Sequence, residues 1–398
     1  MDKTTLLKYI FTGLIVLGII LAIVVSSVIL KQNDYNKRCK DRTQRCLDIY
    51  NDPDNPYPVI KQNPIPNGGK YRNESFGKDK YYGLRDFFYA ASYKSYLPCG
   101  YTNDVVSYNA IKNVLLKGAR AIHLDIFFKG TDPFCDDASI IVGNVIDGEL
   151  AYSECVKEND RYLDFMNCLE LINQIAWSNS DAPLFLYLNM EFLPNTKLEY
   201  QIYSQLFTKC SDKLLDKYYG FQRINIGDIP VNMAINKLVI LTNRIPINGF
   251  LNEITNGVMS ENNTGVILYK ITKEDINFQG IKTKFANKDE ALKVTMHNMV
   301  AVIKESIPNE KNRYDPGMDS ENYDASYHFE LGISMTFMNW QKNPVKYLEK
   351  FKEGGMILKP PELIYIPQQK PPVEDRNTKY DYETTRVTGL NGFYDFDF

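Results

Sequence analysis

The sequence is short of the residues and motifs on which several common classes of protein depend. It contains only three histidines, so few side chains can exchange protons close to neutral pH. None of its seven cysteines forms a C-x-x-C pair, which argues against a zinc ribbon or a thioredoxin-like redox site. The net charge is only −3, so we expect no nucleic-acid partner. No glycine-rich phosphate loop follows an expected strand, which counts against a nucleotide-binding open sheet.

What the sequence does contain is a long apolar run near its N-terminus. The run from Tyr9 to Leu30 carries no charged residue. At a rise of about 1.5 Å per residue, a helix of this length crosses the roughly 30 Å hydrocarbon core of a bilayer. A cleaved secretory signal would have a shorter apolar core and a small-residue cleavage site, so we favour a membrane anchor. We predict a single transmembrane helix over residues 9–30, preceded by a short tip at 1–8.

Positive charge is distributed unevenly around this anchor. Lys3 and Lys8 precede it. The basic residues that follow it are Lys31, Lys37, Arg38, Lys40, Arg42 and Arg45. Because positively charged loops stay in the cytoplasm, we expect a single-pass membrane protein whose large domain faces the cytosol. The same basic run could also lie against anionic headgroups, although a role in topology alone is the simpler interpretation.

Polar segments flank the expected globular part. Residues 31–82 form the basic juxtamembrane segment and a stalk, since 51–70 is rich in proline, asparagine and glycine. Residues 368–398 form a polar C-terminal tail that ends in Phe393-Tyr-Asp-Phe-Asp-Phe398. A disordered tail is the simpler interpretation, and a docking peptide with aromatic anchors is the alternative.

Short apolar runs alternate with longer amphipathic stretches between these segments. The clearest expected strands are Ala121–Phe127, Ser139–Val142, Leu184–Leu188, Leu238–Thr242 and Ile333–Asn339. The clearest expected helices are Val106–Lys117, Asp164–Ala176 and Lys288–Ser306. Alternation of strands and helices predicts a parallel sheet, either open or closed into a barrel.

Short motifs in the first half of this region occur in a distinctive order. They read Ala91-Ser-Tyr-Lys-Ser-Tyr96, Leu116-Lys-Gly-Ala-Arg120 and His123-Leu-Asp-Ile-Phe127. These resemble S-S-H-N-T-Y, L-x-x-G-x-R and E-L-D-x-W in the X-box of phosphoinositide-specific phospholipase C. Pro183–Met190 and Lys237–Arg244 resemble two later strands of the same box, P-V-I-L-S-L-E-N and K-I-L-L-K-G-K.

Motifs of the second half are similar to the family's Y-box. Asp319–Tyr323 resembles D-S-S-N-Y, Phe337–Gln341 resembles A-L-N-F-Q, and Gly354–Pro360 resembles G-G-C-G-Y-x-L-K-P. The resemblance implies a TIM-type (β/α)8 barrel, the α/β fold of phospholipase C-like phosphodiesterases. Its halves would be X-box-like over 83–245 and Y-box-like over 246–367.

The resemblance also implies a site whose catalytic groups are replaced. The family uses two histidines, one to deprotonate the inositol 2-hydroxyl and one to protonate the leaving alkoxide. Their positions fall on Tyr93 and Asn144, and the acid that follows the family's strand tryptophan falls on Phe128 or Lys129. Tyrosine titrates near ~10 and an amide does not titrate, so neither replacement transfers protons at neutral pH.

The family's calcium ligands are replaced in the same way. Their positions fall on Lys94, His123, Asp125 and Asn189, whereas calcium prefers several carboxylate or carbonyl oxygens. Lys94 could take the place of the ion and neutralise Asp125. Glu191 lies two residues beyond Asn189 on the same strand face and could substitute in part.

His123 is the one histidine expected at a strand end of the ancestral site. It is therefore the only candidate base, although a lone histidine inside a barrel is more often a hydrogen-bonded structural residue. We expect His297 in the middle of a helix and His328 in a loop before a strand, both in structural or surface roles.

Candidate contacts to a lipid headgroup are sparse. Thr242 and Arg244 stand near the family's phosphate-binding strand lysines, and Thr283 or Lys284 near its phosphate-binding serine. Arg313 resembles the arginine of an R-I-Y-P segment. Arginine pairs well with phosphate oxygens, so these residues predict a residual site for an anionic headgroup.

The replacements favour a membrane-anchored pseudoenzyme that needs no cofactor. We expect it to bind lipid headgroups, phosphoinositides among them, or to serve as a scaffold for a protein partner that the sequence does not identify. Two alternatives stay open. One is an active phosphoinositide phospholipase C, a phosphoric diester hydrolase with a rearranged site and calcium. The other is a structural membrane protein of a large virus particle.

Overall fold

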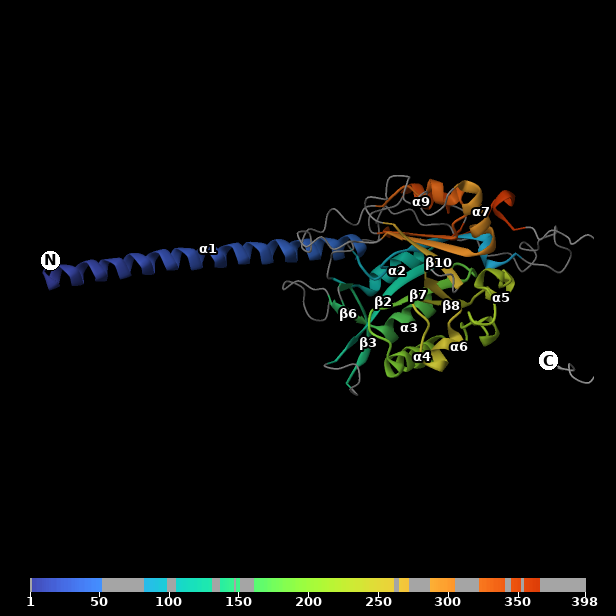
Figure 1. Ribbon diagram of the computed structural model, residues 1–398, viewed down its shortest axis with the longest axis horizontal. Coiled ribbons are helices and arrows are strands. Elements are labelled where there is room, and N and C mark those ends of the chain that lie inside the picture. Colours follow the sequence, from blue (N-terminus) through green and yellow to red (C-terminus); the bar gives the residue numbers. More distant parts are fainter. Residues whose placement is uncertain are drawn as a thin grey trace, which may run out of the picture. The chain divides into compact units, whose positions relative to one another are not determined.

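The protein is described by a computed structural model (Figure 1). The described residues are 2–51, 82–98, 105–130, 137–146, 148–150, 161–260, 265–271, 287–304, 322–340, 345–351 and 354–365. The predicted stalk beyond residue 51 and the predicted tail from residue 368 lie outside these residues.

The first element is one long helix, α1 (Lys3–Asn51). Its segment Tyr9–Lys31 is long and apolar enough to cross a membrane by length and composition, a test that a signal sequence near an N-terminus also passes. The helix continues well past the predicted span of 9–30, into the segment expected to be a juxtamembrane linker. Residues 31–51 contain neither glycine nor proline, and the first proline, Pro53, lies two residues beyond the last residue of the helix.

Within the described residues, eight parallel strands form a closed barrel, which confirms the predicted fold class. The strands are β1 (Phe87–Ser92), β2 (Ala121–Lys129), β7 (Leu184–Met190), β8 (Leu238–Thr242), β9 (Gly257–Ser260), β10 (Gly265–Ile271), β11 (Met299–Lys304) and β12 (Met335–Met338). Each strand pairs with the next in chain order, and β1 pairs with both β2 and β12, which closes the ring. The expected alternation of strand and helix therefore produces a barrel and not an open sheet.

Helices surround the barrel (Figure 1). They are α2 (Tyr108–Leu116), α3 (Phe165–Ile175), α4 (Thr196–Cys210), α5 (Val231–Ala234), α6 (Gly249–Ile254), α7 (Lys288–His297), α8 (Ser326–Glu330) and α9 (Val345–Lys350). Short 3-10 turns are η3 (Leu84–Asp86), η5 (Lys217–Tyr219), η6 (Ile226–Asp228) and η9 (Pro361–Leu363). Polar side chains accept from backbone amides where several helices begin, for example Ser107 at α2, Asp164 at α3 and Asn195 at α4.

Antiparallel strands extend the sheet outside the ring. β13 (Met356–Leu358) pairs with β1, and β3 (Ser139–Gly143) pairs with the last part of β2 and with β6 (Tyr162–Asp164). A separate hairpin joins β4 (Val145–Ile146) to β5 (Glu149–Leu150). The predicted strand at 139–142 is therefore present, but it lies beside the ring and is not one of its parallel strands.

Gly118 and Arg120 explain the motif Leu116-Lys-Gly-Ala-Arg120. Gly118 follows α2 with a φ of 102°, a backbone conformation that side chains with a Cβ rarely adopt. Arg120, two residues later, is buried, and its guanidinium donates to the carbonyl of Ala176 at 2.8 Å and to that of Ala182. The motif therefore turns the chain from α2 into β2 and links β2 to the segment before β7.

The strands are buried on both faces, and alternate side chains of a strand face the helices or the barrel interior. On β2, Ile122 and Leu124 pack in the layer between strands and helices. Ala121 packs inside the barrel, so His123 and Asp125, at the same strand parity, also face the interior.

The assignment of residues 288–306 to a single helix is wrong. α7 ends at His297, and β11 begins at Met299. The Met299–Ile303 run is apolar and partly β-branched, so it fits a buried strand, and the strand bonds of the barrel hold it there. His297 is consequently the last residue of α7 and not a mid-helix residue. His328 was expected in a loop, but it lies in α8 and is buried.

Candidate functional site at the carboxyl ends of the strands

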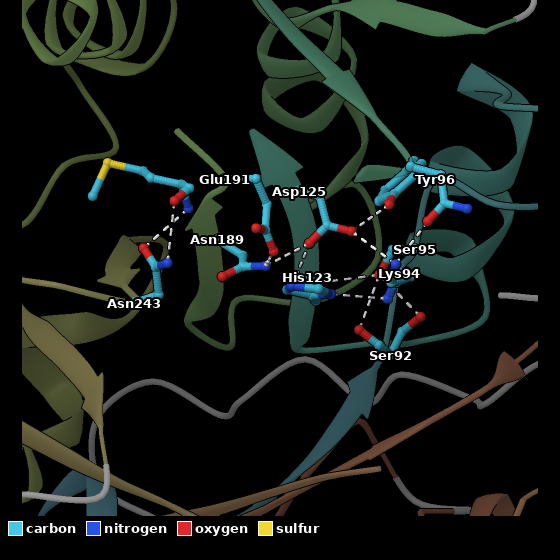
Figure 2. Close-up of polar contacts among 11 residues, drawn as sticks. Ser92, Lys94, Ser95, Tyr96, His123, Asp125, Asn189, Glu191 and Asn243 are labelled. Atoms are coloured by element: carbon cyan, nitrogen blue, oxygen red, sulfur yellow. Dashed lines mark hydrogen bonds and ion pairs between the residues drawn. The ribbon is translucent and has the colours of Figure 1, made fainter. Parts of the chain in front are cut away.

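Polar side chains converge where β1, β2 and β7 end (Figure 2). Lys94 follows β1, Asp125 lies on β2, and Asn189 lies opposite Asp125 on β7. Asn144 joins them from the residue after β3. The carboxyl ends of parallel strands are where barrel enzymes place their reactive residues. The structure therefore brings together several of the residues that the family motifs indicate.

Asp125 is the centre of this group, and four donors converge on its carboxylate. Oδ2 lies 3.2 Å from Lys94 Nζ and accepts from the Tyr96 hydroxyl. Oδ1 lies 3.2 Å from His123 Nε2 and accepts from Asn189 Nδ2 at 2.7 Å. The side chain of Asp125 is only 1% exposed. Its charge is therefore balanced almost entirely by protein groups.

The surroundings of Asp125 determine its protonation state. Burial alone raises the pKa of this carboxyl, but the Lys94 ammonium, the His123 ring and the Asn189 amide outweigh burial and hold the pKa well below its usual range. In turn, burial and the nearby Asp125 charge raise the pKa of Tyr96 well above its usual value. Asp125 is therefore an ionised acceptor and Tyr96 a neutral donor at neutral pH.

Lys94 is held in place by its backbone as well as by its ion pair. Its Nζ also donates to Asn144 Oδ1 at 2.7 Å, and its side chain is almost fully buried. The backbone adopts a φ of 44°, a left-handed conformation that is uncommon for lysine and persists only where neighbouring contacts enforce it. The Leu97 amide donates to the Lys94 carbonyl at 3.0 Å and closes the turn. The ammonium is therefore directed into the site.

His123 uses both of its ring nitrogens inside the protein. The Lys94 amide donates to Nδ1 at 3.1 Å, so Nδ1 carries no proton and Nε2–H faces Asp125. The ring stacks between Tyr93, at 4.7 Å between centroids, and Tyr187, at 4.9 Å. In this arrangement neither nitrogen has a lone pair available for a substrate proton.

A serine pair fixes the loop after β1 against β2 (Figure 2). Ser95 Oγ donates to the Ser92 carbonyl at 3.0 Å, and the backbone amide of Ser95 donates to the His123 carbonyl at 3.0 Å. The His123 amide donates to Ser95 Oγ at 3.3 Å. These bonds position Lys94 and Tyr96, the residues on either side of Ser95.

Glu191 lies at the edge of the Asp125 group. Asn189 Nδ2 donates to Glu191 Oε1 at 2.6 Å, so one amide group bridges the two carboxylates. Burial, and then repulsion from Asp125, raise the pKa of Glu191. The side chain is half-buried, so it is the carboxyl of this group with access to solvent.

The donor set around Asp125 does not fit a calcium ion. Calcium requires several oxygen atoms whose lone pairs point at it. Here the groups that face Asp125 are an ammonium, a ring N–H, a hydroxyl that donates and an amide NH2. Among the described residues, no cluster of three or more histidine, cysteine, aspartate or glutamate side chains is placed to hold a metal.

The other positions that the family motifs indicate as catalytic are occupied by side chains with internal contacts. Tyr93 is half-buried and stacks on His123, and Asn144 is buried against Lys94. Phe128 is half-buried, and Lys129 lies over the Tyr162 ring at 4.7 Å.

The two predicted headgroup contacts that the structure describes, Thr242 and Arg244, are both engaged by groups of the protein. Thr242 is buried at the strand parity of residues that face the helices, and its hydroxyl donates to the Arg244 carbonyl at 2.8 Å. The Arg244 guanidinium donates to the Met190 carbonyl at 2.8 Å and pairs with the buried carboxylate of Glu199 at 3.4 Å. Thr283, Lys284 and Arg313 lie outside the described residues.

The other two histidines do not contact Asp125. His297 is exposed at the end of α7, and its Nδ1 contacts the Lys293 carbonyl at 2.7 Å. His328 Nδ1 lies 3.1 Å from Thr336 Oγ1, and burial lowers the pKa of His328 to about 3.

The sequence analysis assigns no role to two tyrosines of the site. Tyr96 donates to Asp125, and Tyr187 stacks on His123. Both have signals in the sequence. Tyr96 ends the first motif, and Tyr187 precedes Asn189 by two residues and so shares its strand face.

Comparison with known proteins rests on structure. No protein-family model matches the sequence, and no curated protein matches it. The crystal structure of PLC21 from S. officinalis matches with a TM-score of 0.53 and 13% identity, over 74% of this chain and 39% of that chain. PLC21 from L. pealei matches with a TM-score of 0.52 and 14% identity, over 71% of this chain and 38% of that chain.

A further match is a calcium-dependent phosphoinositol-specific phospholipase C from a Pseudomonas species, with a TM-score of 0.41 and 9% identity, over 69% of this chain and 94% of that chain. The chain spans less than two fifths of each PLC21 chain. At such identities the two PLC21 matches establish the fold alone. The chain therefore has the phospholipase C-like barrel fold that its sequence motifs predict.

Proposed function

We propose that the chain is a membrane-anchored, non-catalytic phospholipase C-like protein that acts through binding and not through turnover. The observation that carries this proposal is the ion pair between Lys94 Nζ and Asp125 at 3.2 Å in a buried site. The lysine supplies the positive charge that a divalent cation would otherwise bring to this carboxylate. A fixed ammonium cannot coordinate a phosphate oxygen and a nucleophile together, as a metal ion can.

The proton-transfer groups support the same proposal. General acid and base catalysis needs groups with a pKa near the working pH and within reach of the substrate. The tyrosine at position 93 and the amide at position 144 are unsuited to that task. His123, the remaining candidate, is enclosed by two tyrosine rings, the Lys94 amide and Asp125.

The proposed setting is a membrane with the barrel on the cytosolic side. The apolar segment of α1 and the basic residues that follow it support this topology. The proposed ligand is an anionic lipid headgroup. Of its predicted contacts, Arg244 is already engaged by Glu199, so it is available only if that pair opens.

One observation favours a second candidate, a phosphodiesterase with a rearranged site. Glu191 is half-buried with a raised pKa, which suits a group that protonates a leaving alkoxide. His123, freed from its present contacts, would have to serve as the base.

Hydrolysis by the full chain in vesicles tests the proposal. Release of inositol phosphates is measured from phosphatidylinositol and from its 4,5-bisphosphate, with calcium and with chelator. We expect no release above that of vesicles without protein. Turnover that His123→Ala or Glu191→Gln abolishes would establish the second candidate, whereas turnover unaffected by both variants and by chelator would indicate a contaminating enzyme.

A further inference from the structure

The long helix α1 continues far beyond the segment that is able to cross a membrane (Figure 1). That segment ends at Lys31, whereas α1 ends at Asn51. At a rise of about 1.5 Å per residue, the helix between these two residues is about 30 Å long. The headgroup layer on each side of the hydrocarbon core is only about 5–8 Å thick. We call residues 31–51 the α1 extension, and along the direction of the span most of it lies in water.

The membrane-spanning part of the same helix makes the α1 extension easier to form. Starting a helix in water is unfavourable, because several backbone torsions are fixed for one hydrogen bond, whereas lengthening an existing helix adds one bond for each residue. The span supplies the existing helix. Arginine, lysine and glutamine, which have high helix propensity, recur throughout the extension. The extension therefore needs no packing partner in order to start.

Charged residues of the extension occur at spacings that stabilise a single helix. Asp34 lies four residues before Arg38. Asp41 lies four residues from both Lys37 and Arg45. Residues four apart are neighbours on a helix surface, so these pairs of opposite charge support the helix in water. The side chains of the extension that the structure describes are all exposed, and they are Lys31, Asn33, Asp34, Lys37, Asp41 and Gln44. A helix that is polar on all sides is typical of a segment that bridges through solvent.

A helix that lay along the bilayer surface would need a different sequence. The chain would have to bend sharply near Lys31, and sharp bends occur at proline, at glycine or serine pairs, or at π-bulges. The extension contains no glycine, proline or serine, and α1 is one uninterrupted α-helix. A surface helix also needs an apolar face along its length, whereas Tyr35 is the one large apolar residue of the segment 31–46.

We propose that the α1 extension is a rigid helical spacer, which holds the attachment point of the rest of the chain about 30 Å from the hydrocarbon core. A tilt of about 20°, which is average for membrane helices, lowers this height by only about 2 Å. The chain that leads to the barrel therefore starts in water, beyond the headgroups of the leaflet that α1 crosses. The inference rests on the membrane anchoring in the proposed function and is independent of whether the barrel is catalytic.

Energy transfer from single positions of the reconstituted full chain to the bilayer tests this proposal. A fluorescent amino acid is incorporated at Asn33, Gln44 or Asn51, so that the native cysteines stay unlabelled. The phosphatidylcholine vesicles contain a small fraction of lipid with an acceptor dye on its headgroup. On a helical spacer the three positions lie about 3, 20 and 30 Å beyond Lys31 along the axis. Transfer should therefore fall in steps, by at least about twofold between residues 33 and 51.

Gln44→Pro and Gln44→Ala are a matched pair of variants for the rigidity of the spacer. Proline inside a helix removes a hydrogen bond and clashes with the preceding turn, whereas alanine preserves the helix. A chain interrupted at this point brings residue 51 closer to the bilayer for part of the time. We expect Gln44→Pro to raise the transfer from residue 51 and to leave that from residue 33 unchanged. Gln44→Ala should change neither.

Two results would overturn the proposal. Equal transfer from the three positions would show that the extension lies along the bilayer. Equal transfer from residue 51 in the two Gln44 variants would show that the extension is not rigid. Flotation with the vesicles separates these failures from a failure of the proposed function. A chain that does not float lacks the anchor on which both proposals depend, whereas a floating chain with equal transfer from all positions contradicts the spacer alone.

Discussion

Two buried lysines occupy the two ends of this barrel, and their surroundings differ. Lys94, at the carboxyl ends of the strands, lies 3.2 Å from the Asp125 carboxylate. Lys359, after β13, donates to Ser334 Oγ at 3.2 Å, and its ammonium lies 5.7 Å from the centre of the Phe88 ring. Burial lowers the pKa of Lys359 to about 7, an effect that Asp86 opposes only in part.

The comparison shows which contacts keep a buried side chain charged in this barrel. Asp86 accepts from the Gly83 amide at 2.8 Å, and burial raises its pKa. Asp125, in contrast, keeps a pKa well below its usual range because an ammonium and further donors surround it. Burial therefore opposes both charges at the amino end, whereas the Asp125 group offsets burial with direct contacts.

The largest effect on stability is expected for Lys94→Met. Removal of the ammonium leaves the Asp125 carboxylate buried without its ion-pair partner, so we expect a loss of about 3–5 kcal/mol in the free energy of unfolding. Denaturant unfolding of the detergent-solubilised chain measures this. Lys112→Met, at an exposed lysine of α2, should change the free energy by less than about 0.5 kcal/mol.

Adding Asp125→Asn to Lys94→Met tests the cause. If the loss comes from an uncompensated charge, the double variant should be more stable than Lys94→Met alone. A double variant that is less stable than Lys94→Met would show that the loss comes from packing.

The amino-end lysine predicts a pH effect of intermediate size. Between a folded pKa of about 7 and the unfolded value near 10.5, the unfolded chain binds a proton that the folded chain does not. Stability should therefore rise with pH in this window, by about 1 kcal/mol between pH 7 and pH 8. Lys359→Met should remove this rise, as measured by the difference between wild-type and variant unfolding curves. Parallel curves at all pH values would refute the assignment.

A further effect of about this size concerns the Tyr93 ring that stacks on His123. Tyr93→Leu removes the stacked ring and should lower the free energy of unfolding by about 0.5–1.5 kcal/mol. Tyr93→Phe keeps the ring and should be close to wild type. Equal losses in both variants would show that the hydroxyl, and not the stacking, is what matters at this position.

Part of the fold could be predicted from periodicity. β2, β7 and β8 are apolar on both faces and lie within one or two residues of their expected bounds. β11 was missed because the helical spacing of α7 continues into an apolar run, and only pairing with β10 and β12 makes that run a strand. Tertiary contacts decide such cases, and a single sequence does not contain them directly.

The site was partly predictable from the family motifs and not from periodicity. The family motifs mark the strand ends, so the sequence alone groups Lys94, Asp125 and Asn189. Contacts from outside the motifs were not predictable. Arg244 was expected to face a ligand, but Glu199, eight residues after Glu191 on the next helix, engages its guanidinium instead.

Lys94, and not a metal ion, is the cationic partner that we assign to Asp125. Calorimetric titration of the reconstituted full chain with calcium, beside an Asp125→Asn variant, distinguishes the two partners. We predict the same heats for the two proteins, because the ammonium and the other donors already occupy the carboxylate. Saturable calcium binding by the wild-type chain that Asp125→Asn abolishes would show instead that a metal ion is the partner of this carboxylate.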